Sequence, residues 1–238
     1  MNERASGEEE AASAPPFDGD PSWRAVHLLA DGTELVVRPI QPTDRDALRD
    51  AFRRTSPRTK YLRFLGVIGD LDDGMLDYLT AVDQRDHIAL VATIASPDLK
   101  TEIGVGVGRF IRIEDEPTVA EGAITVADGM QRRGVGTILA RELAGAARAT
   151  GIRTMRAEVL ESNVVMRTIL EHAGATSRDA HEGTVAYDLA ITPKDEPGFF
   201  EQVLRGAAET MAMTIRRLLP PGARPRMPSA PGTTTERE

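Results

Sequence analysis

The sequence contains no cysteine. This absence excludes disulfide bonds, thiolate metal sites and a cysteine nucleophile. It also fits a reducing compartment, and we expect the protein to be cytoplasmic. The four histidines form no close pair in the sequence, so we assign none of them a role and predict no metal site.

The sequence also lacks a long apolar segment. No apolar run approaches the ~18 residues that a membrane-spanning helix requires. The N-terminus is acidic, with glutamate at residues 8–10, and it has neither the cationic start nor the apolar core of a secretory signal. We therefore expect no stable membrane insertion. With 41% apolar and 28% charged residues, the composition is typical of a soluble globular protein.

Net positive charge is lacking as well, since the formal net charge is −8 at pH 7. This argues against general affinity for nucleic acids. An acidic surface could attract a basic substrate such as a lysine-bearing protein, although solubility alone explains the charge. Lysine occurs only at Lys60, Lys100 and Lys194 among 29 basic residues, an arginine bias typical of a GC-rich bacterial genome.

Composition along the chain predicts one domain with appendages. Residues 1–20 are polar and rich in Ala, Glu, Ser, Pro and Gly, so we expect a disordered tail. Residues 21–192 form the expected domain. Residues 193–219 comprise a linker and an amphipathic helix, whose apolar stripe could pack on the domain, form a homodimer or dock weakly on a membrane. Residues 220–238 form a second expected tail, rich in Pro, Gly and Thr.

Within the domain, the pattern of apolar residues predicts alternating strands and helices. Asp31-Gly32 between two apolar runs predicts a hairpin, and Thr43 is an expected helix N-cap. The expected strands are 23–29, 33–40, 87–95, 102–113, 119–127, 154–160 and 184–191, and the expected helices are 43–54, 72–81, 134–150 and 163–173. One strand carries three alternating glycines, which we interpret as tight packing against a helix. We predict an α/β fold with a mixed sheet and helices on both faces.

The stretch Q-R-R-G-V-G-T, residues 131–137, joins a strand to a helix. The first N–H groups of a helix have no partner within it and lie at the positive end of the helix dipole. Gly134 and Gly136 lack the Cβ atoms that would keep a large anion away, and Arg132 and Arg133 add positive charge. Such a junction can bind a phosphate or pyrophosphate. The alternative is an ordinary tight turn with a solvated arginine pair.

The whole string is more specific than its glycines. It contains neither a G-x-G-x-x-G dinucleotide fingerprint nor the Gly-Lys-Ser/Thr of a P-loop. It resembles the acetyl-CoA signature Q/R-x-x-G-x-G/A of the GNAT acetyltransferases. The resemblance covers roughly residues 34–190. It implies a GNAT-type mixed, mostly antiparallel sheet, splayed at its centre, and acetyl-CoA as co-substrate with no metal.

Two further segments resemble the same family. Residues 161–175 resemble the GNAT segment in which an Asn ends a strand and starts a helix that a glycine stops, and Asn163 is the matching Asn. Two roles of Asn163 stay open. Its side chain would either cap the helix and also contact the ligand, or cap the helix alone. The loop at residues 55–65 resembles the acceptor-side segment of the bacterial protein lysine acetyltransferases. Its matching residues are Ser56, Tyr61, Arg63 and Phe64. The alternative is a loop whose aromatic side chains only pack in the core.

The bacterial protein lysine acetyltransferases carry a glutamate base in A-E-x-A-x-x-V, ten residues before the Q-x-x-G-x-G string. Here residues 120–126 read A-E-G-A-I-T-V, with Glu121 ten residues before Gln131. The resemblance implies that Glu121 removes the proton from a lysine ammonium, whose pKa of ~10.4 keeps it non-nucleophilic at neutral pH. The alternative is a strand-edge glutamate in solvent.

The resemblance also implies the donor site. Backbone groups of Ile124, Thr125 and Val126 would pair with the pantetheine arm, in the manner of an added strand. The resemblance further implies that the pyrophosphate and the rest of acetyl-CoA bind to residues after this strand. These residues are Gln131, Arg132, Arg133, Gly134, Val135, Gly136, Thr137 and Asn163.

One departure from the family concerns the general acid. Many GNAT enzymes carry a tyrosine a few residues after the Asn, where it protonates the departing thiolate, and residues 164–170 contain none. Tyr187 is a distant substitute. Because coenzyme A thiol is an acceptable leaving group, an acid is also dispensable.

The resemblance implies an acetyl-CoA-dependent N-acetyltransferase that acts on a protein lysine, with an acyl-CoA synthetase as one candidate partner. A small-molecule amine acetyltransferase stays open as an alternative, because loops such as 55–73 set the acceptor. A non-catalytic acetyl-CoA sensor that acts through helix 199–219 also stays open, although the presence of Glu121 favours an enzyme.

Overall fold

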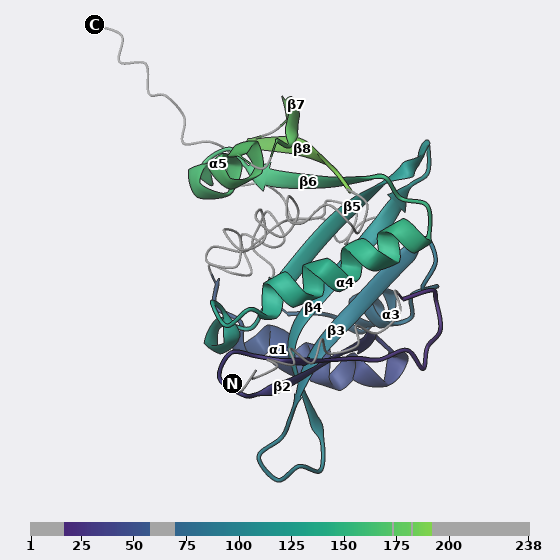
Figure 1. Ribbon diagram of the computed structural model, residues 1–238, viewed down its shortest axis with the longest axis vertical. Coiled ribbons are helices and arrows are strands. Elements are labelled where there is room, and N and C mark those ends of the chain that lie inside the picture. The colour runs from purple at the N-terminus through teal and green to yellow at the C-terminus, as the bar shows by residue number, and fades with distance from the viewer. Residues whose placement is uncertain (1–16, 58–69, 173, 182, 192–238) are drawn as a thin grey trace, which may run out of the picture.

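The computed structural model describes residues 17–57, 70–172, 174–181 and 183–191 (Figure 1). Three segments that the sequence singles out lie outside these residues. They are the tail before Phe17, the segment with Tyr61, Arg63 and Phe64, and everything from residue 192 onward, including the expected helix 199–219.

Eight strands form one sheet in the order β1-β2-β3-β4-β5-β6-β8-β7 (Figure 1). The strands are β1 Ala25–Leu28, β2 Glu34–Pro39, β3 His87–Ala95, β4 Glu102–Ile113, β5 Glu116–Val126, β6 Thr154–Leu160, β7 Thr176–His181 and β8 Thr184–Ala190. Of the described strand pairs, β5 and β6 run parallel and the others antiparallel. This confirms the mixed, mostly antiparallel sheet.

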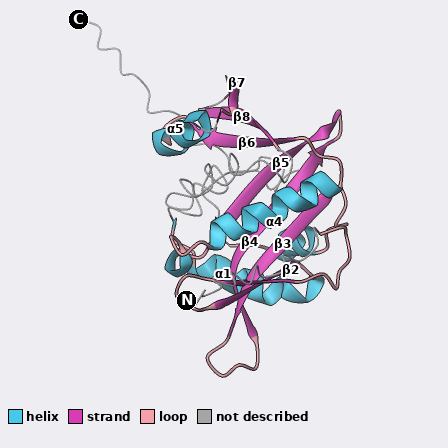
Figure 2. Ribbon diagram, viewed as in Figure 1, coloured by secondary structure: helices cyan, strands magenta, loops and turns pink. Residues whose placement is uncertain are grey.

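Helices cover both faces of the sheet, as Figure 2 shows. The helices are α1 Arg45–Arg54, α3 Asp73–Thr80, α4 Val135–Ala149 and α5 Val164–His172, with 3-10 turns η1 Pro42–Asp44 and η2 Asp128–Met130. Successive residues of a strand point to opposite faces, so Ile124 packs in the larger core with α4, whereas Ala123 packs in a smaller core with α1 and α3.

The sheet divides between β5 and β6. These two strands pair only from Val119 with Thr154 to Glu121 with Arg156. Beyond that register β5 continues to Val126 and β6 to Leu160, and the two strands diverge (Figure 1). The sheet is therefore splayed at its centre, and β5 has an edge that β6 does not cover.

Tight packing against α4 explains one of the alternating glycines of β4. A Cβ on Gly106 would lie 2.8 Å from Leu139 Cδ1 and 3.1 Å from the Thr125 carbonyl oxygen. A Cβ on Gly108 would lie at an ordinary contact distance of 3.6 Å from Leu143 Cδ2, and a Cβ on Gly104 would lie 4.0 Å from Val91 Cγ2 of β3. The packing interpretation is therefore confirmed at Gly106, whereas Gly104 and Gly108 have room for a Cβ.

Three expectations for local structure need correction. Thr43 does not cap the first helix, because a 3-10 turn precedes α1 and Asp44 closes it by accepting a hydrogen bond from Gln41 N at 2.8 Å. The structure also contains β7, an edge strand that we did not predict. In addition Phe17, which the sequence places in the tail, is fully buried and packs edge-on against Trp23, with ring centroids 5.5 Å apart.

Candidate active site

Glu121 lies at the point where the sheet divides. It is the last residue of β5 in register with β6, and its neighbour on β4 is Ile111. The residue is only 5% exposed, which contradicts the alternative of a strand-edge glutamate in solvent. Its register partner Arg156 directs its guanidinium to Asp188 and Glu116, at 2.7 and 2.6 Å. The structure thus places a buried carboxylate at the closed end of the gap between β5 and β6.

Beyond Glu121, β5 borders this gap along the stretch predicted to pair with pantetheine. Ile124, Thr125 and Val126 are in register with Gly108, Val107 and Gly106 of β4. Ile124 and Val126 are buried towards α4, whereas Thr125 points to the α1 face and lines a pocket there. Among the described strands, none pairs with the other edge of β5 at this level, so its backbone groups can accept an added strand.

The junction at residues 131–137 forms the start of α4. Gly134 is the N-cap, with φ of 90°, and no side chain of the described residues caps it. A Cβ on Gly134 would meet no heavy atom within 4 Å. The helix therefore begins beside open space with its positive end exposed, as anion binding requires.

The three polar side chains of the junction differ in their hydrogen-bond and ion-pair partners. Arg132 is exposed and has a left-handed backbone, with φ of 61°. Arg133 instead forms an ion pair with Asp31 of the β1–β2 turn, and this pairing lowers the pKa of Asp31 to about 2. Gln131 donates hydrogen bonds to Asp128 Oδ1 at 3.0 Å and Val126 O at 3.3 Å. Gln131 thus closes the turn, and both arginines are exposed, although Arg133 pairs with Asp31.

The remaining sequence-predicted positions have mainly structural roles in this state. Val135 and Gly136 are buried in the first turn of α4. Asn163 caps α5, since its Oδ1 accepts a hydrogen bond from Met166 N at 3.3 Å. The hydroxyl of Tyr187 donates to Glu171 Oε1 at 2.8 Å and accepts from Arg167 Nε at 3.2 Å. The strand register places Tyr187 on the sheet face opposite Glu121.

Three titratable residues on the Glu121 face were not predicted. Arg109 Nη1 of β4 donates a hydrogen bond to His87 Nε2 of β3 at 3.4 Å, and the His87 ring lies 5.5 Å from the ring of Tyr78 of α3. Burial, helped by the charge of Arg109, lowers the pKa of His87 to about 3, so the ring is neutral at pH 7. Burial raises the pKa of Tyr78, Arg109 opposes this shift and Glu121 adds to it.

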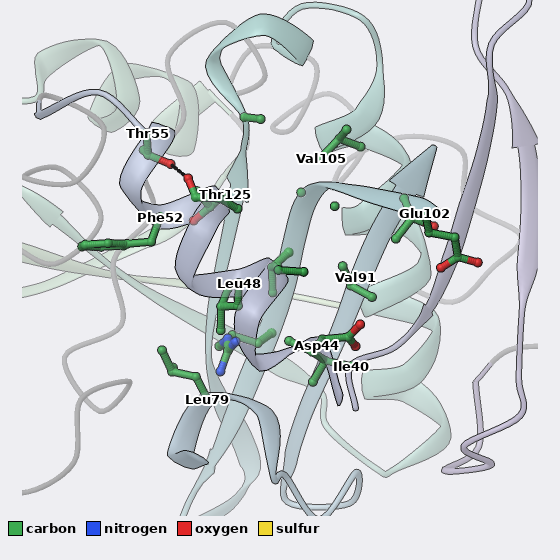
Figure 3. Close-up of a pocket in the computed structure, with 18 of the residues that line it drawn as sticks. Ile40, Asp44, Leu48, Phe52, Thr55, Leu79, Val91, Glu102, Val105 and Thr125 are labelled. Atoms are coloured by element: carbon green, nitrogen blue, oxygen red, sulfur yellow. Dashed lines mark hydrogen bonds between the residues drawn. The ribbon is translucent and has the colours of Figure 1, made fainter. Parts of the chain in front are cut away.

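A pocket of about 130 Å³ lies between α1 and the sheet on this same face (Figure 3). Its walls are mainly apolar side chains of α1, α3 and β3, among them Leu48, Phe52, Leu79 and Val91. Thr125 also lines it and connects the pocket to the β5 stretch beside the gap. The arrangement combines a helix start without a side-chain cap, an open strand edge among the described strands, a buried carboxylate and a pocket.

Neither a membrane span nor a metal cluster is found in the described part of the chain. No helix there is long and apolar enough to cross a membrane. No three His, Cys, Asp or Glu side chains of the described residues gather where they could hold a metal ion.

Comparison with known proteins identifies a family. The model of the acetyltransferase (GNAT) domain matches residues 34–176. Acetyltransferase PA5475 of Pseudomonas aeruginosa is 33% identical over 168 residues, which cover 70% of this chain and 89% of that protein. Acetyltransferase Pat of Mycolicibacterium smegmatis is 31% identical over 178 residues, which cover 72% of this chain. This chain spans only 51% of Pat.

Solved structures agree with these relatives. The crystal structure of the GNAT domain of S. lividans PAT matches with a TM-score of 0.62 and 31% identity, covering 71% of this chain and 97% of that one. The structure of yncA from Salmonella typhimurium, solved with its cofactor acetyl-CoA, matches with a TM-score of 0.50 and 17% identity. It covers 69% of this chain and 98% of that one, and at this identity the likeness concerns the fold alone.

Proposed function

The chain belongs to the GNAT family of acetyltransferases, and we propose that it transfers acetyl from acetyl-CoA to a protein lysine with Glu121 as the general base. The acetyltransferase assignment rests on the family. The acceptor and the role of Glu121 are our proposal, and the resemblance of residues 120–126 to the bacterial lysine acetyltransferases supports both.

Binding of the donor would use three parts of the chain. The N–H groups at the start of α4, with Arg132, would hold the pyrophosphate at the positive end of the helix dipole. Backbone groups of residues 124–126 would pair with the pantetheine arm along the open edge of β5. One backbone N–H of this stretch would polarise the thioester carbonyl. These contacts would fix the thioester near the closed end of the gap, where Glu121 lies.

The reaction then requires a neutral amine. A lysine ammonium has a pKa of ~10.4 and no free electron pair at neutral pH. Glu121 would take one proton from it, directly or through water. The amine nitrogen forms a bond with the acetyl carbon and the carbon–sulfur bond breaks. The nitrogen then loses its second proton to solvent, while the thiolate leaves with the electron pair and takes up a proton from solvent. No general-acid tyrosine is needed in this scheme.

The observation that carries the proposal is the position of Glu121. The carboxylate is only 5% exposed and lies at the last residue of β5 that pairs with β6. Buried titratable side chains at such a site are candidates for a chemical role. Its burial where β5 and β6 diverge, together with the A-E-G-A-I-T-V spacing before Gln131, supports Glu121 as the base.

The test compares the protein with its Glu121→Gln variant. Both are incubated with labelled acetyl-CoA and a deacetylated lysate of the host, and acetyl-CoA binding is titrated separately. We expect turnover to fall by about a hundredfold or more with donor affinity nearly unchanged. Glu114→Gln, an exposed position in the β4–β5 turn, is the matched control and should keep full activity.

The distribution of label distinguishes the acceptors. Label in discrete protein bands, lost in Glu121→Gln, supports a protein lysine acetyltransferase, and mass spectrometry then identifies targets such as an acyl-CoA synthetase. Label only in the small-molecule fraction would point to an amine metabolite as acceptor. Binding of acetyl-CoA without any transfer would point to a sensor. Full activity in Glu121→Gln would reject this residue as the base.

A further inference from the structure

Arg109 is the most deeply buried charged residue among those described, with 1% exposure. Its guanidinium carries five N–H donors, yet within the described part of the chain its one hydrogen-bond contact is His87 Nε2 at 3.4 Å. The Nε atom is buried and has no partner there. Arg109 takes part in none of the ion pairs found among the described residues. Arg109 is therefore a buried cation whose hydrogen-bonding capacity is largely unused.

Such an arrangement is unfavourable unless something else satisfies it. Burying an ionised group without a counter-charge has a high free-energy penalty, and burial lowers the pKa of Arg109 to about 10. An apolar residue of similar volume would fill the same space with less desolvation. Residues that reduce stability in this way are found at functional sites, which suggests that Arg109 meets an anion in another state of the protein.

The pocket under α1 supplies the space for that anion. Arg109 lines it together with Thr125, whose buried Oγ1 also has no partner in the described residues. Of the other charged side chains of its wall, Arg38 pairs with both Asp44 and Glu102 at 2.8 Å, and Glu102 also pairs with Arg24 at 2.8 Å. Its volume, about 130 Å³, is near the ~150 Å³ of a cavity that holds benzene, so five or six heavy atoms can be accommodated.

We infer that this pocket binds a carboxylate carried on a short apolar chain, with Arg109 as its counter-ion and Thr125 as a second hydrogen-bond donor. The apolar walls would contact the chain, and the guanidinium would bind the carboxylate through two parallel N–H donors. This inference goes beyond the proposed function, because it concerns a binding site that acetyl transfer to lysine does not require.

The carboxylate could come from either reactant. Thr125 lies in the β5 stretch proposed for the donor, so a dicarboxylic acyl-CoA such as succinyl-CoA could direct its far end into the pocket. The transfer step would then break the same carbon–sulfur bond and form the same carbon–nitrogen bond, with the far carboxylate unchanged. Alternatively, the carboxylate belongs to an amino-acid acceptor.

The test begins with binding rather than turnover. Butyrate is the probe, butyramide is its neutral counterpart, and thermal unfolding is followed with each at millimolar concentration. We expect butyrate to raise the Tm of the full chain and butyramide to leave it unchanged. The butyrate shift should be lost in Arg109→Met and retained in Arg153→Gln, an exposed arginine outside the pocket. Without ligand, Arg109→Met should keep or raise the Tm.

Each outcome decides the inference. No butyrate shift in the wild type, an equal shift with butyramide, or an equal shift in Arg109→Met would overturn it. If the site serves the donor, kcat/KM for succinyl-CoA should exceed that for butyryl-CoA, and Arg109→Met should reverse this order. If it serves the acceptor, butyrate should compete with the acceptor only. Acetyl transfer to lysine can succeed or fail independently, so the two proposals are separable.

Discussion

Gly122 has no side chain, and Met155 of β6 fills the space beside it. A Cβ on Gly122 would lie 2.3 Å from the sulfur and 2.7 Å from Cγ of Met155, distances at which one of the two residues must move. Met155 is itself only 2% exposed and has little room to do so. The contact lies next to Glu121, where β5 and β6 stop pairing, so it sets the spacing of the two strands at the closed end of the gap.

We therefore predict that Gly122→Ala destabilises the protein by about 1–3 kcal/mol, because the added methyl overpacks a filled core. It should also weaken acetyl-CoA binding, since the strands that flank the gap would shift. Urea unfolding and a donor titration measure the two effects. Gly129→Ala is the control, because its Cβ would meet no atom within 4 Å, and its effect should stay within about 0.5 kcal/mol. Equal destabilisation in the two variants would contradict the packing argument.

At the scale of elements, the β1–β2 turn is coupled to the start of α4. Arg133 contacts Asp31 and Thr33 of that turn and Met130 Sδ at 2.8 Å. Both arginines of the junction are exposed, but Arg133 has Asp31 as an ion-pair partner. An incoming anion would compete with Asp31 for Arg133.

This asymmetry predicts opposite effects on donor affinity. Arg132→Ala should weaken acetyl-CoA binding about tenfold, the effect of losing one charge-assisted hydrogen bond. Asp31→Asn should release Arg133 and tighten binding, because the guanidinium then reaches the phosphates without competition. Isothermal titration at low and high salt provides the measurement, and Arg148→Ala in the last turn of α4 is the control. If Arg132→Ala and Asp31→Asn both leave the dissociation constant unchanged, the pyrophosphate does not bind at this helix start.

The elements that the sequence predicts well are those with one apolar face. The Asp31-Gly32 hairpin, the close packing of Gly106 on α4 and the start of α3 beside Asp72 follow from local residues. β7 was missed because its sequence, T-S-R-D-A-H, has almost no apolar alternation. It is an edge strand held by hydrogen bonds to β8, and pairing of this kind depends on a partner rather than on local periodicity.

At the scale of the whole molecule, the residues of the candidate site also differ in whether the local sequence predicts them. Glu121 and the 131–137 junction are continuous in sequence, so motif and spacing identified them. Tyr78, His87 and Arg109 come from three elements that only the strand register and the placement of α3 bring together. The sequence offered one signal for Arg109, which is a charged residue inside an otherwise apolar strand. The alternation of residues alone does not tell whether such a side chain faces solvent or a pocket.

The burial of His87 should also make the global stability of the protein depend on pH. The pKa of His87 is about 3 in the folded protein and ~6.5 in an unfolded chain. The unfolded state therefore binds the proton first as pH falls, and stability decreases from about pH 6.5 towards pH 3. At about pH 4.5 the loss from this residue should be roughly 2–3 kcal/mol. Urea unfolding should show that His87→Gln loses less stability than the wild type between about pH 7 and pH 4.5. Equal losses would mean that His87 titrates alike in both states, and that the ring is not held neutral beside Arg109.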